Sequence, residues 1–168
     1  LSASYQNQVV NAVKLFFRTI QKRSMEVDLI HRPKRANLLP NVLSKEEVKL
    51  ILTASSNLKH RTMLSLIYSC GLRCGELIAL KLEHLDFNRG LVLIKQGKGK
   101  KDRIVPLSGK TITMITVYLE TYKPKTYLFG GMKDGEPYDA RSLQNVLKQS
   151  LAKTGIKRSV TLHWLRHS

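Results

Sequence analysis

The sequence is poor in acidic residues. Its 168 residues include 12 Asp and Glu against 29 Lys and Arg, which gives a formal net charge of +17. So basic a chain favours a polyanionic partner, and nucleic acid is the first candidate. DNA binding, RNA or ribosomal binding and a simply basic protein all stay open on charge alone.

Cysteine and long apolar runs are also scarce. The two cysteines, Cys70 and Cys74, are four residues apart, but no matching Cys or His pair follows to complete a zinc site. We interpret them as small hydrophobic residues and expect no disulfide, which indicates a reducing, cytoplasmic location. No apolar run approaches membrane-spanning length, so we predict no membrane segment. Leu1 is neither an initiator Met nor the start of a signal peptide, so we expect residues upstream.

The chain divides into three predicted segments. In residues 1–25 apolar residues recur at helical spacing, which predicts one amphipathic helix from Ser4 to about Arg23. Such a helix cannot bury its stripe alone, so we interpret it as the last element of a truncated domain. Residues 26–42 contain prolines and a basic cluster with Lys34 and Arg35, which indicates a linker between domains. This linker either lies along a phosphate backbone or is a solvated loop.

Residues 43–168 predict an α+β domain that is mostly helical. Ser44 and Glu47 form a capping box, and Gly71 is well placed to end a helix in a left-handed conformation. Short β-rich runs predict a small three-stranded antiparallel sheet with the helices packed around it. Three helices are expected around residues 48–52, 63–67 and 73–80. Three more are expected at 111–121, at 140–154, where Gly155 ends the helix, and from 161 onward. The expected strands are 85–88, 91–94 and 103–107.

Two basic motifs are candidates for phosphate binding. Arg73 follows a tight turn at Gly71 and opens a helix, where free N–H groups favour an anion and a guanidinium can grip two oxygens. The second is a glycine-spaced basic tip between two strands, which lacks the helix and the Ser or Thr of a P-loop. Its cationic residues are Lys98, Lys100, Lys101 and Arg103. Either motif taken alone is more often a plain surface feature.

The segment from His163 to Ser168 is the sharpest signal. In a helix His163, Arg166 and His167 share one face, so a guanidinium fork and an imidazole point the same way. The two histidines also have the spacing of a zinc metalloprotease, but that motif needs Glu after the first His, where this chain has Trp164. We therefore predict no metal at this site.

Together these motifs resemble the tyrosine recombinase or phage integrase family. They read Gly-Leu-Arg-x-x-Glu-Leu, Gly-Lys-Gly-x-Lys-x-Arg and His-x-Leu-Arg-His-Ser, in this order between Gly71 and Ser168. The resemblance covers residues 43–168, as the family's catalytic domain, while Ser2–Lys22 resembles the final helix of its core-binding domain. The implied fold is that catalytic domain, and the implied activity is site-specific breakage and rejoining of DNA strands through a covalent 3′-phosphotyrosine.

The resemblance also implies roles for individual residues. Arg73 and Arg166 would grip the scissile phosphate, Lys98 would protonate the leaving 5′ oxygen, and His163 would handle a proton or bind the phosphate. Glu76 would be structural. The expected DNA contacts are Lys34, Arg35, Lys100, Lys101, Arg103 and His167. No cofactor is implied. The implied partner is double-stranded DNA, on which the full-length protein would form a homotetramer at paired sites. This fragment alone would be monomeric.

The expected nucleophile is missing from the pattern. In the family the tyrosine follows the His-x-Leu-Arg-His box, whereas all 6 tyrosines of this chain precede it. We therefore expect this fragment to be a C-terminally truncated enzyme, inactive alone. A non-catalytic DNA-binding module on the same scaffold and a zinc hydrolase using His163 and His167 are the alternatives.

Overall fold

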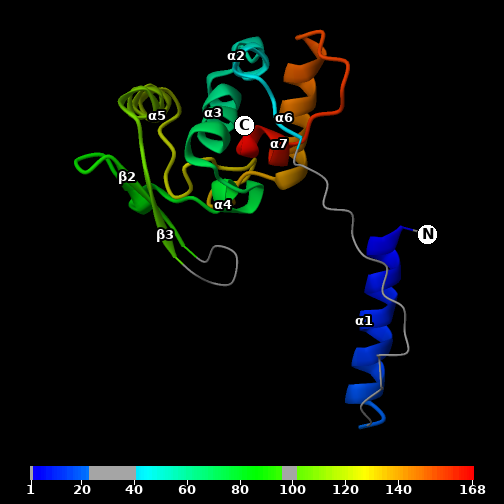
Figure 1. The fold of residues 1–168 in the computed structure, drawn as a ribbon. Helices are drawn as coiled ribbons and strands as arrows, with labels where there is room; N and C mark the ends of the chain where they lie inside the picture. The colour runs from blue at the N-terminus through cyan, green and yellow to red at the C-terminus, as the bar shows by residue number, and fades with distance from the viewer. Residues whose placement is uncertain (1, 23–40, 96–101) are drawn as a thin grey trace. The chain divides into compact units, whose positions relative to one another are not determined.

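A computed structural model describes residues 2–22, 41–95 and 102–168 (Figure 1). The chain forms two compact units, residues 1–39 and 40–168. Lys34, Arg35, Lys98, Lys100 and Lys101, which we predicted to contact DNA or to act in catalysis, lie outside the described residues.

The first unit contains the expected amphipathic helix, α1 (Ala3–Thr19), which ends four residues before the predicted end at about Arg23. The Ser2 hydroxyl caps it by accepting a hydrogen bond of 3.3 Å from the N–H of Tyr5. Its apolar stripe is exposed, including Leu15 at 65% and Phe16 at 52%. Because a helix gains most of its stability by burying such a stripe, α1 by itself is an incomplete packing unit.

The second unit is mostly helical, as predicted. The predicted capping box is present at its first helix: the N–H of Ser44 donates to Glu47 Oε2 over 2.8 Å, and the N–H of Glu47 donates to the Ser44 hydroxyl over 3.2 Å. Gly71 ends the next helix with a φ of 58°, also as predicted. The helices are α2 (Lys45–Ala54), α3 (Leu58–Cys70), α4 (Cys74–Ile78), α5 (Gly109–Tyr122), α6 (Ala140–Ala152) and α7 (Leu162–His167), with a 3-10 turn at Leu82–His84.

The sheet has the predicted three antiparallel strands, in the order β1 (Leu85–Asp86), β2 (Leu91–Ile94) and β3 (Arg103–Pro106). Ile94 pairs with Arg103, so β3 begins directly after the hairpin connection. The first strand is shorter than the predicted 85–88, because the N–H of Arg89 donates to Asp86 Oδ1 over 2.9 Å and closes a turn.

The predicted end of the penultimate helix was also too late. We expected α6 to continue to Thr154, but the helix ends at Ala152. The N–H groups of Lys153 and Thr154 instead donate to the carbonyls of Ser150 and Leu151, three residues back, which tightens the final turn. Gly155 follows with a φ of +71°.

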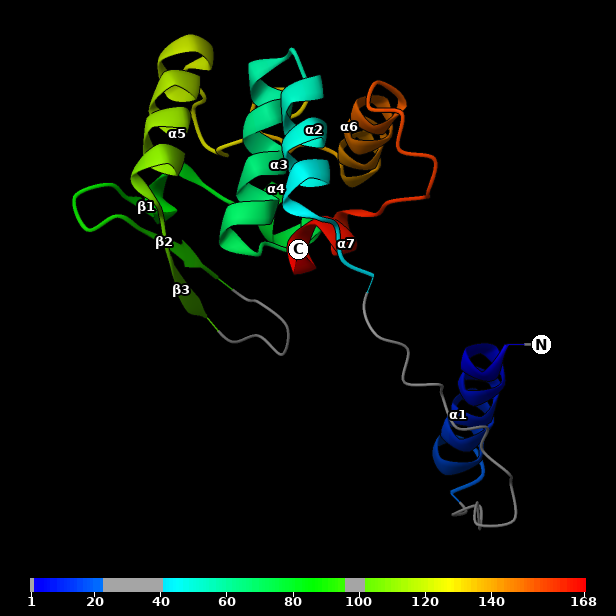
Figure 2. The same cartoon turned by 45° about the horizontal axis from the view of Figure 1, so that its top comes forward.

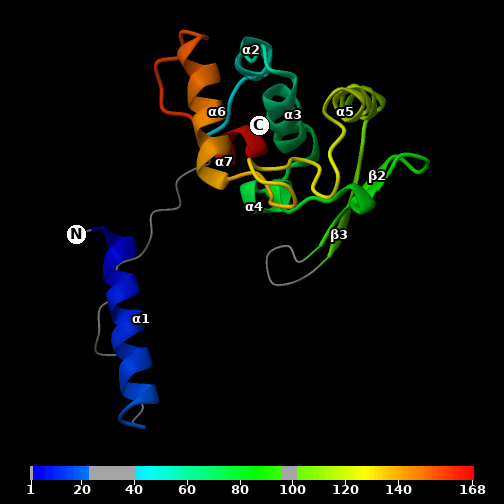
Figure 3. The same ribbon diagram turned by 180° about the vertical axis from the view of Figure 1, so that it is seen from behind.

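Helix α3 forms the centre of the core. It packs against α2, α5, α6 and α7, so that α5 lies on one side of it and α6 and α7 on the other (Figures 2 and 3). Met63, Leu64 and Ile67 of α3 are fully buried, as is Leu165 of α7. This packing places α4 and α7 against α3. No helix of the described ranges 2–22, 41–95 and 102–168 is long and apolar enough to cross a bilayer.

Candidate active site

The turn between α3 and α4 positions the first candidate arginine. Gly71 adopts the left-handed conformation with no side chain to strain it, and Leu72 is buried beneath the turn. Arg73 is extended and caps α4; its N–H donates to Glu76 Oε2 over 2.8 Å, and its Nη1 donates to Oε1 over 2.7 Å. The expected free N–H is therefore bound to a carboxylate, while the Arg73 side chain stays 42% exposed.

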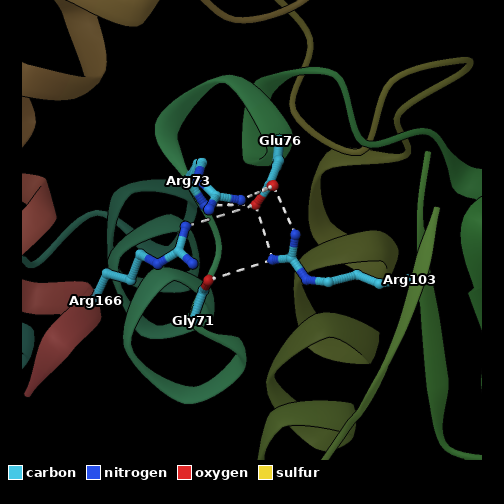
Figure 4. A network of polar contacts seen from close by, with 5 residues as sticks. All are labelled: Gly71, Arg73, Glu76, Arg103 and Arg166. Atoms are coloured by element: carbon cyan, nitrogen blue, oxygen red, sulfur yellow. Dashed lines mark hydrogen bonds and ion pairs between the residues drawn. The ribbon is translucent and has the colours of Figure 1, made fainter. Parts of the chain in front are cut away.

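A second arginine reaches the same carboxylate from the sheet. Arg103 Nη1 donates to Glu76 Oε1 over 2.6 Å, and its Nη2 donates to Oε2 over 2.9 Å. Nη2 also lies 3.4 Å from the carbonyl oxygen of Gly71 (Figure 4). We predicted Arg103 as a DNA contact; in the structure its guanidinium forms a fork-to-fork pair with Glu76.

The third arginine comes from α7. Thr161 caps this helix by accepting from the N–H of Trp164, and Leu162 and Leu165 anchor it in the core. Arg166 thereby points at Glu76, with Nη1 at 4.0 Å from Oε2 (Figure 4). Among the described residues, this Nη1 is the one buried side-chain nitrogen or oxygen without a hydrogen-bond partner. The Glu76 carboxylate is thus the anionic partner of this nitrogen, at ion-pair rather than hydrogen-bond distance.

The electrostatics of the cluster follow from its composition. Burial opposes the ionisation of Glu76, but the hydrogen bonds from Arg103 and from both the backbone and side chain of Arg73 outweigh it and hold the pKa of Glu76 at about 2. Burial, together with the positive charge of Arg73, lowers the pKa of Arg166, while Glu76 opposes this effect. One carboxylate thus serves three guanidiniums, which leaves a net positive site.

The histidines lie on the exposed side of α7. His163 and His167 pack edge to face with ring centroids 4.3 Å apart, so they share one face, as the i, i+4 spacing predicted. His163 also lines a pocket of about 370 Å³ together with Cys74, which directly follows Arg73. In the part of the chain that the structure describes, no group of three or more His, Cys, Asp or Glu could hold a metal ion.

The structure brings together Arg73 and Arg166 at Glu76, while His163 lines a pocket with Cys74, the residue after Arg73. It adds Arg103 and gives Glu76 the central place, which the sequence pattern did not reveal because Glu76 and Arg103 are 27 residues apart on different elements. Only the i, i+3 spacing of Arg73 and Glu76 at a helix start signalled an interaction.

Comparison with known proteins decides the family. The model of the phage integrase family matches residues 41–168. The chain belongs to this family. Two relatives are the tyrosine recombinase XerA of Pyrococcus horikoshii, 33% identical over 96% of this chain, and the tyrosine recombinase XerD of Staphylococcus aureus, 38% identical over 83%. The chain spans only 57% and 51% of these relatives' lengths.

Solved structures of this family share the fold. The crystal structure of XerA recombinase, 30% identical, covers 99% of this chain with a TM-score of 0.69, and the chain covers 60% of it. The structure of XerH site-specific recombinase bound to palindromic difH substrate is 24% identical, with a TM-score of 0.80. The match includes 100% of this chain and 53% of the XerH chain. The α+β fold expected from the sequence is therefore confirmed as that of phage integrase catalytic domains.

Proposed function

We propose that the full-length protein is a tyrosine-type site-specific recombinase that cuts and rejoins double-stranded DNA through a covalent 3′-phosphotyrosine. The observation that carries this proposal is the convergence of Arg73 and Arg166 on one site, where three guanidiniums meet the single Glu76 carboxylate. Two fixed guanidiniums suit the extra negative charge of a pentavalent phosphorane. The family membership of the chain gives the same chemistry.

The proposed reaction needs a small number of groups. A tyrosine oxygen attacks the phosphorus, the bond to the 5′ oxygen breaks, and the 5′ hydroxyl leaves with a proton. We assign that proton to Lys98 and a proton-handling or phosphate-binding role to His163, which lines a pocket with Cys74, the residue after Arg73. As the resemblance implies, the nucleophile would be a tyrosine that follows the His163 box, and every tyrosine of this chain precedes that box.

The energetics of this step require no cofactor. The phosphotyrosine conserves the free energy of the phosphodiester, so rejoining is the reverse of cleavage with another 5′ hydroxyl as attacking group. Arg73 and Arg166 stabilise the same charge in both directions. This symmetry agrees with our expectation that the reaction proceeds without a cofactor.

The organisation of the full-length protein follows from the same proposal. Residues 1–25 would end a core-binding domain, residues 26–42 would link it to the catalytic domain, and residues 43–168 would form most of that domain. The proposed DNA contacts from the linker and hairpin are Lys34, Arg35, Lys100 and Lys101, joined by His167 on α7. We expect a homotetramer on paired DNA sites for the full-length protein and a monomer for the 168-residue chain.

The proposed location is the cytoplasm. Neither cysteine forms a disulfide: Cys70 is buried and Cys74 is partly buried. Burial raises the pKa of both thiols, which keeps them protonated and unreactive. Both properties suit a protein that acts on DNA in a reducing compartment.

The test is covalent capture of DNA by the full-length protein. A nicked duplex, selected from a random-sequence library for binding, lets the cleaved strand diffuse away and traps the adduct for denaturing electrophoresis. We expect an adduct with the wild-type protein and a fall of roughly 10²–10³-fold in its rate for Arg73→Ala and for Arg166→Ala. Arg89→Ala, which removes an exposed arginine from the turn after β1, is the matched control.

The outcomes separate the alternatives. Adduct formation at full rate in both arginine variants contradicts the proposed site. DNA binding with no adduct from the wild-type protein favours the non-catalytic binding module. Stoichiometric zinc in the purified protein, with hydrolysis that stops on its removal, favours the hydrolase reading of His163 and His167.

A further inference from the structure

Arg103 presents its guanidinium to the inside of the site. It is the first residue of β3, and its side chain is only 33% exposed. Both terminal nitrogens face the Glu76 carboxylate, at 2.6 and 2.9 Å, and Nη2 also approaches the Gly71 carbonyl (Figure 4). The fork that would grip a DNA phosphate is therefore turned toward a carboxylate that is itself 7% exposed.

The pairing determines how Glu76 is oriented. Oε1 accepts from Arg103 Nη1 and Arg73 Nη1, and Oε2 accepts from Arg103 Nη2 and the Arg73 N–H. Each oxygen is thus shared between the two arginines, which leaves Arg166 Nη1 at 4.0 Å, beyond hydrogen-bond range. A carboxylate held on both oxygens cannot turn toward Arg166.

Loss of Arg103 would change this balance. The lone pairs that Arg103 occupies would become free, and the carboxylate could rotate to form its own fork-to-fork pair with Arg166 or Arg73. Either pair would engage both carboxylate oxygens, bind one guanidinium more tightly than the present contacts do and draw it away from the phosphate. Positioning of this kind matters because a misplacement of about 1 Å can lower a rate by about 10²-fold.

We propose that Arg103 is a positioning residue for the strand-transfer reaction: it clamps Glu76 so that Arg73 is held and Arg166 makes only a long ion pair of 4.0 Å with the carboxylate, which leaves its hydrogen-bonding capacity for the phosphate. This role rests on the proposed function above. It differs from the DNA contact that the sequence suggested for Arg103. The proposed role of Arg103 also links β3 to Arg73 and Arg166, because Arg103 is the first residue of β3, directly after the connection from β2.

The first test compares Arg103→Ala and Arg103→Lys with Arg89→Ala in the full-length protein. At saturating nicked DNA we expect the adduct rate to fall about 10²-fold for Arg103→Ala. Arg103→Lys should retain only part of the rate, because an ammonium cannot pair with both oxygens. The Kd for DNA and its salt dependence should match those of Arg89→Ala.

The second test follows Glu76 itself and needs no catalysis. In the 168-residue chain the carboxyl ¹³C resonance of Glu76 reports its pKa, which we expect to rise in Arg103→Ala and to stay unchanged in Arg89→Ala. In the full-length protein, Arg103→Ala combined with Glu76→Gln should lose no more rate than the more damaging single change, because the two residues act as one unit.

Each contrary result is specific. A weaker Kd with a salt slope reduced by about 0.9, and an unchanged rate at saturation, would make Arg103 a DNA contact and overturn the proposal. An unchanged Glu76 titration would overturn it as well, as would a folded Arg103→Lys variant with the wild-type rate. If the wild-type protein forms no adduct, the strand-transfer proposal fails, and the positioning role of Arg103 in that reaction fails with it. The titration then still shows whether Arg103 holds Glu76.

Discussion

The backbone N–H of Leu43 donates a hydrogen bond of 2.8 Å to the hydroxyl of Ser168, 125 residues away. The same hydroxyl donates to the carbonyl of Trp164 over 2.8 Å, so Ser168 joins the approach to α2 with the last turn of α7. Nearby, Arg158 pairs with Glu47 of α2 and lies over the ring of Trp164, with 5.8 Å between its Cζ and the ring centroid. The helix that carries Arg166 is therefore tied to the first residues of its domain.

This tie predicts the effect of removing the hydroxyl. Ser168→Ala leaves the N–H of Leu43 without its acceptor, and we expect a loss of about 1 kcal/mol in the free energy of unfolding, measured by urea titration. Ser159→Ala, which changes an exposed serine, is the matched control and should have little effect. Equal stability of both variants and the wild type would show that the hydrogen bond contributes nothing.

The turn before Arg73 predicts a backbone effect. Gly71 has a φ of +58° and nothing within 4 Å of an added Cβ, so Gly71→Ala introduces strain without a clash. We expect it to lower the free energy of unfolding by about 1 kcal/mol, with Gly71→Asn less damaging. Gly75→Ala is the matched control, because Gly75 lies inside α4 with open space around it and an ordinary φ. Stability should not fall in that variant; equal losses at both positions would contradict the assigned cause.

Glu76 predicts how stability depends on pH. Its pKa is lowered from 4.5 to about 2, so its ionised form binds the folded protein's arginines more strongly than it binds solvent. This stabilisation is complete above the unfolded pKa near 4.5 and is lost as pH falls toward about 2. Glu76→Gln should cost roughly 2–3 kcal/mol at pH 7 and remove that part of the acid dependence. Chemical unfolding from pH 7 down to pH 3 checks both; an acid limb identical to that of the wild type would contradict the prediction.

The net charge predicts the salt dependence of DNA binding. With +17 on 168 residues, we expect the chain to bind duplex DNA through many phosphate contacts. Roughly six to ten contacts would weaken the affinity by about 10³–10⁵ between about 50 and 200 mM salt, which fluorescence anisotropy measures directly. A flat salt response would contradict every nucleic-acid function for this chain.

Local sequence patterns predicted the elements well for physical reasons. The Ser44 and Glu47 capping box, the left-handed Gly71 and the antiparallel strands depend on contacts between close neighbours, and all were confirmed. The errors were at element ends. The side chain of Asp86 accepts a hydrogen bond that closes a turn and ends β1 earlier than expected. After Ala152 the backbone N–H groups bond to carbonyls three residues back instead of four, which ends α6 earlier than expected.

The sequence by itself determined the basic charge, the α+β pattern and the motifs that carry Arg73, Lys98 and Arg166. Only the tertiary structure decided that Glu76 collects three arginines, Arg73, Arg103 and Arg166, from three different elements. The reason is physical: spacing along the chain fixes which face of an element a side chain occupies. The partner that it meets depends on how α4 and α7 pack against α3 and on the pairing of β3 with β2. This packing is settled by buried residues elsewhere in the chain.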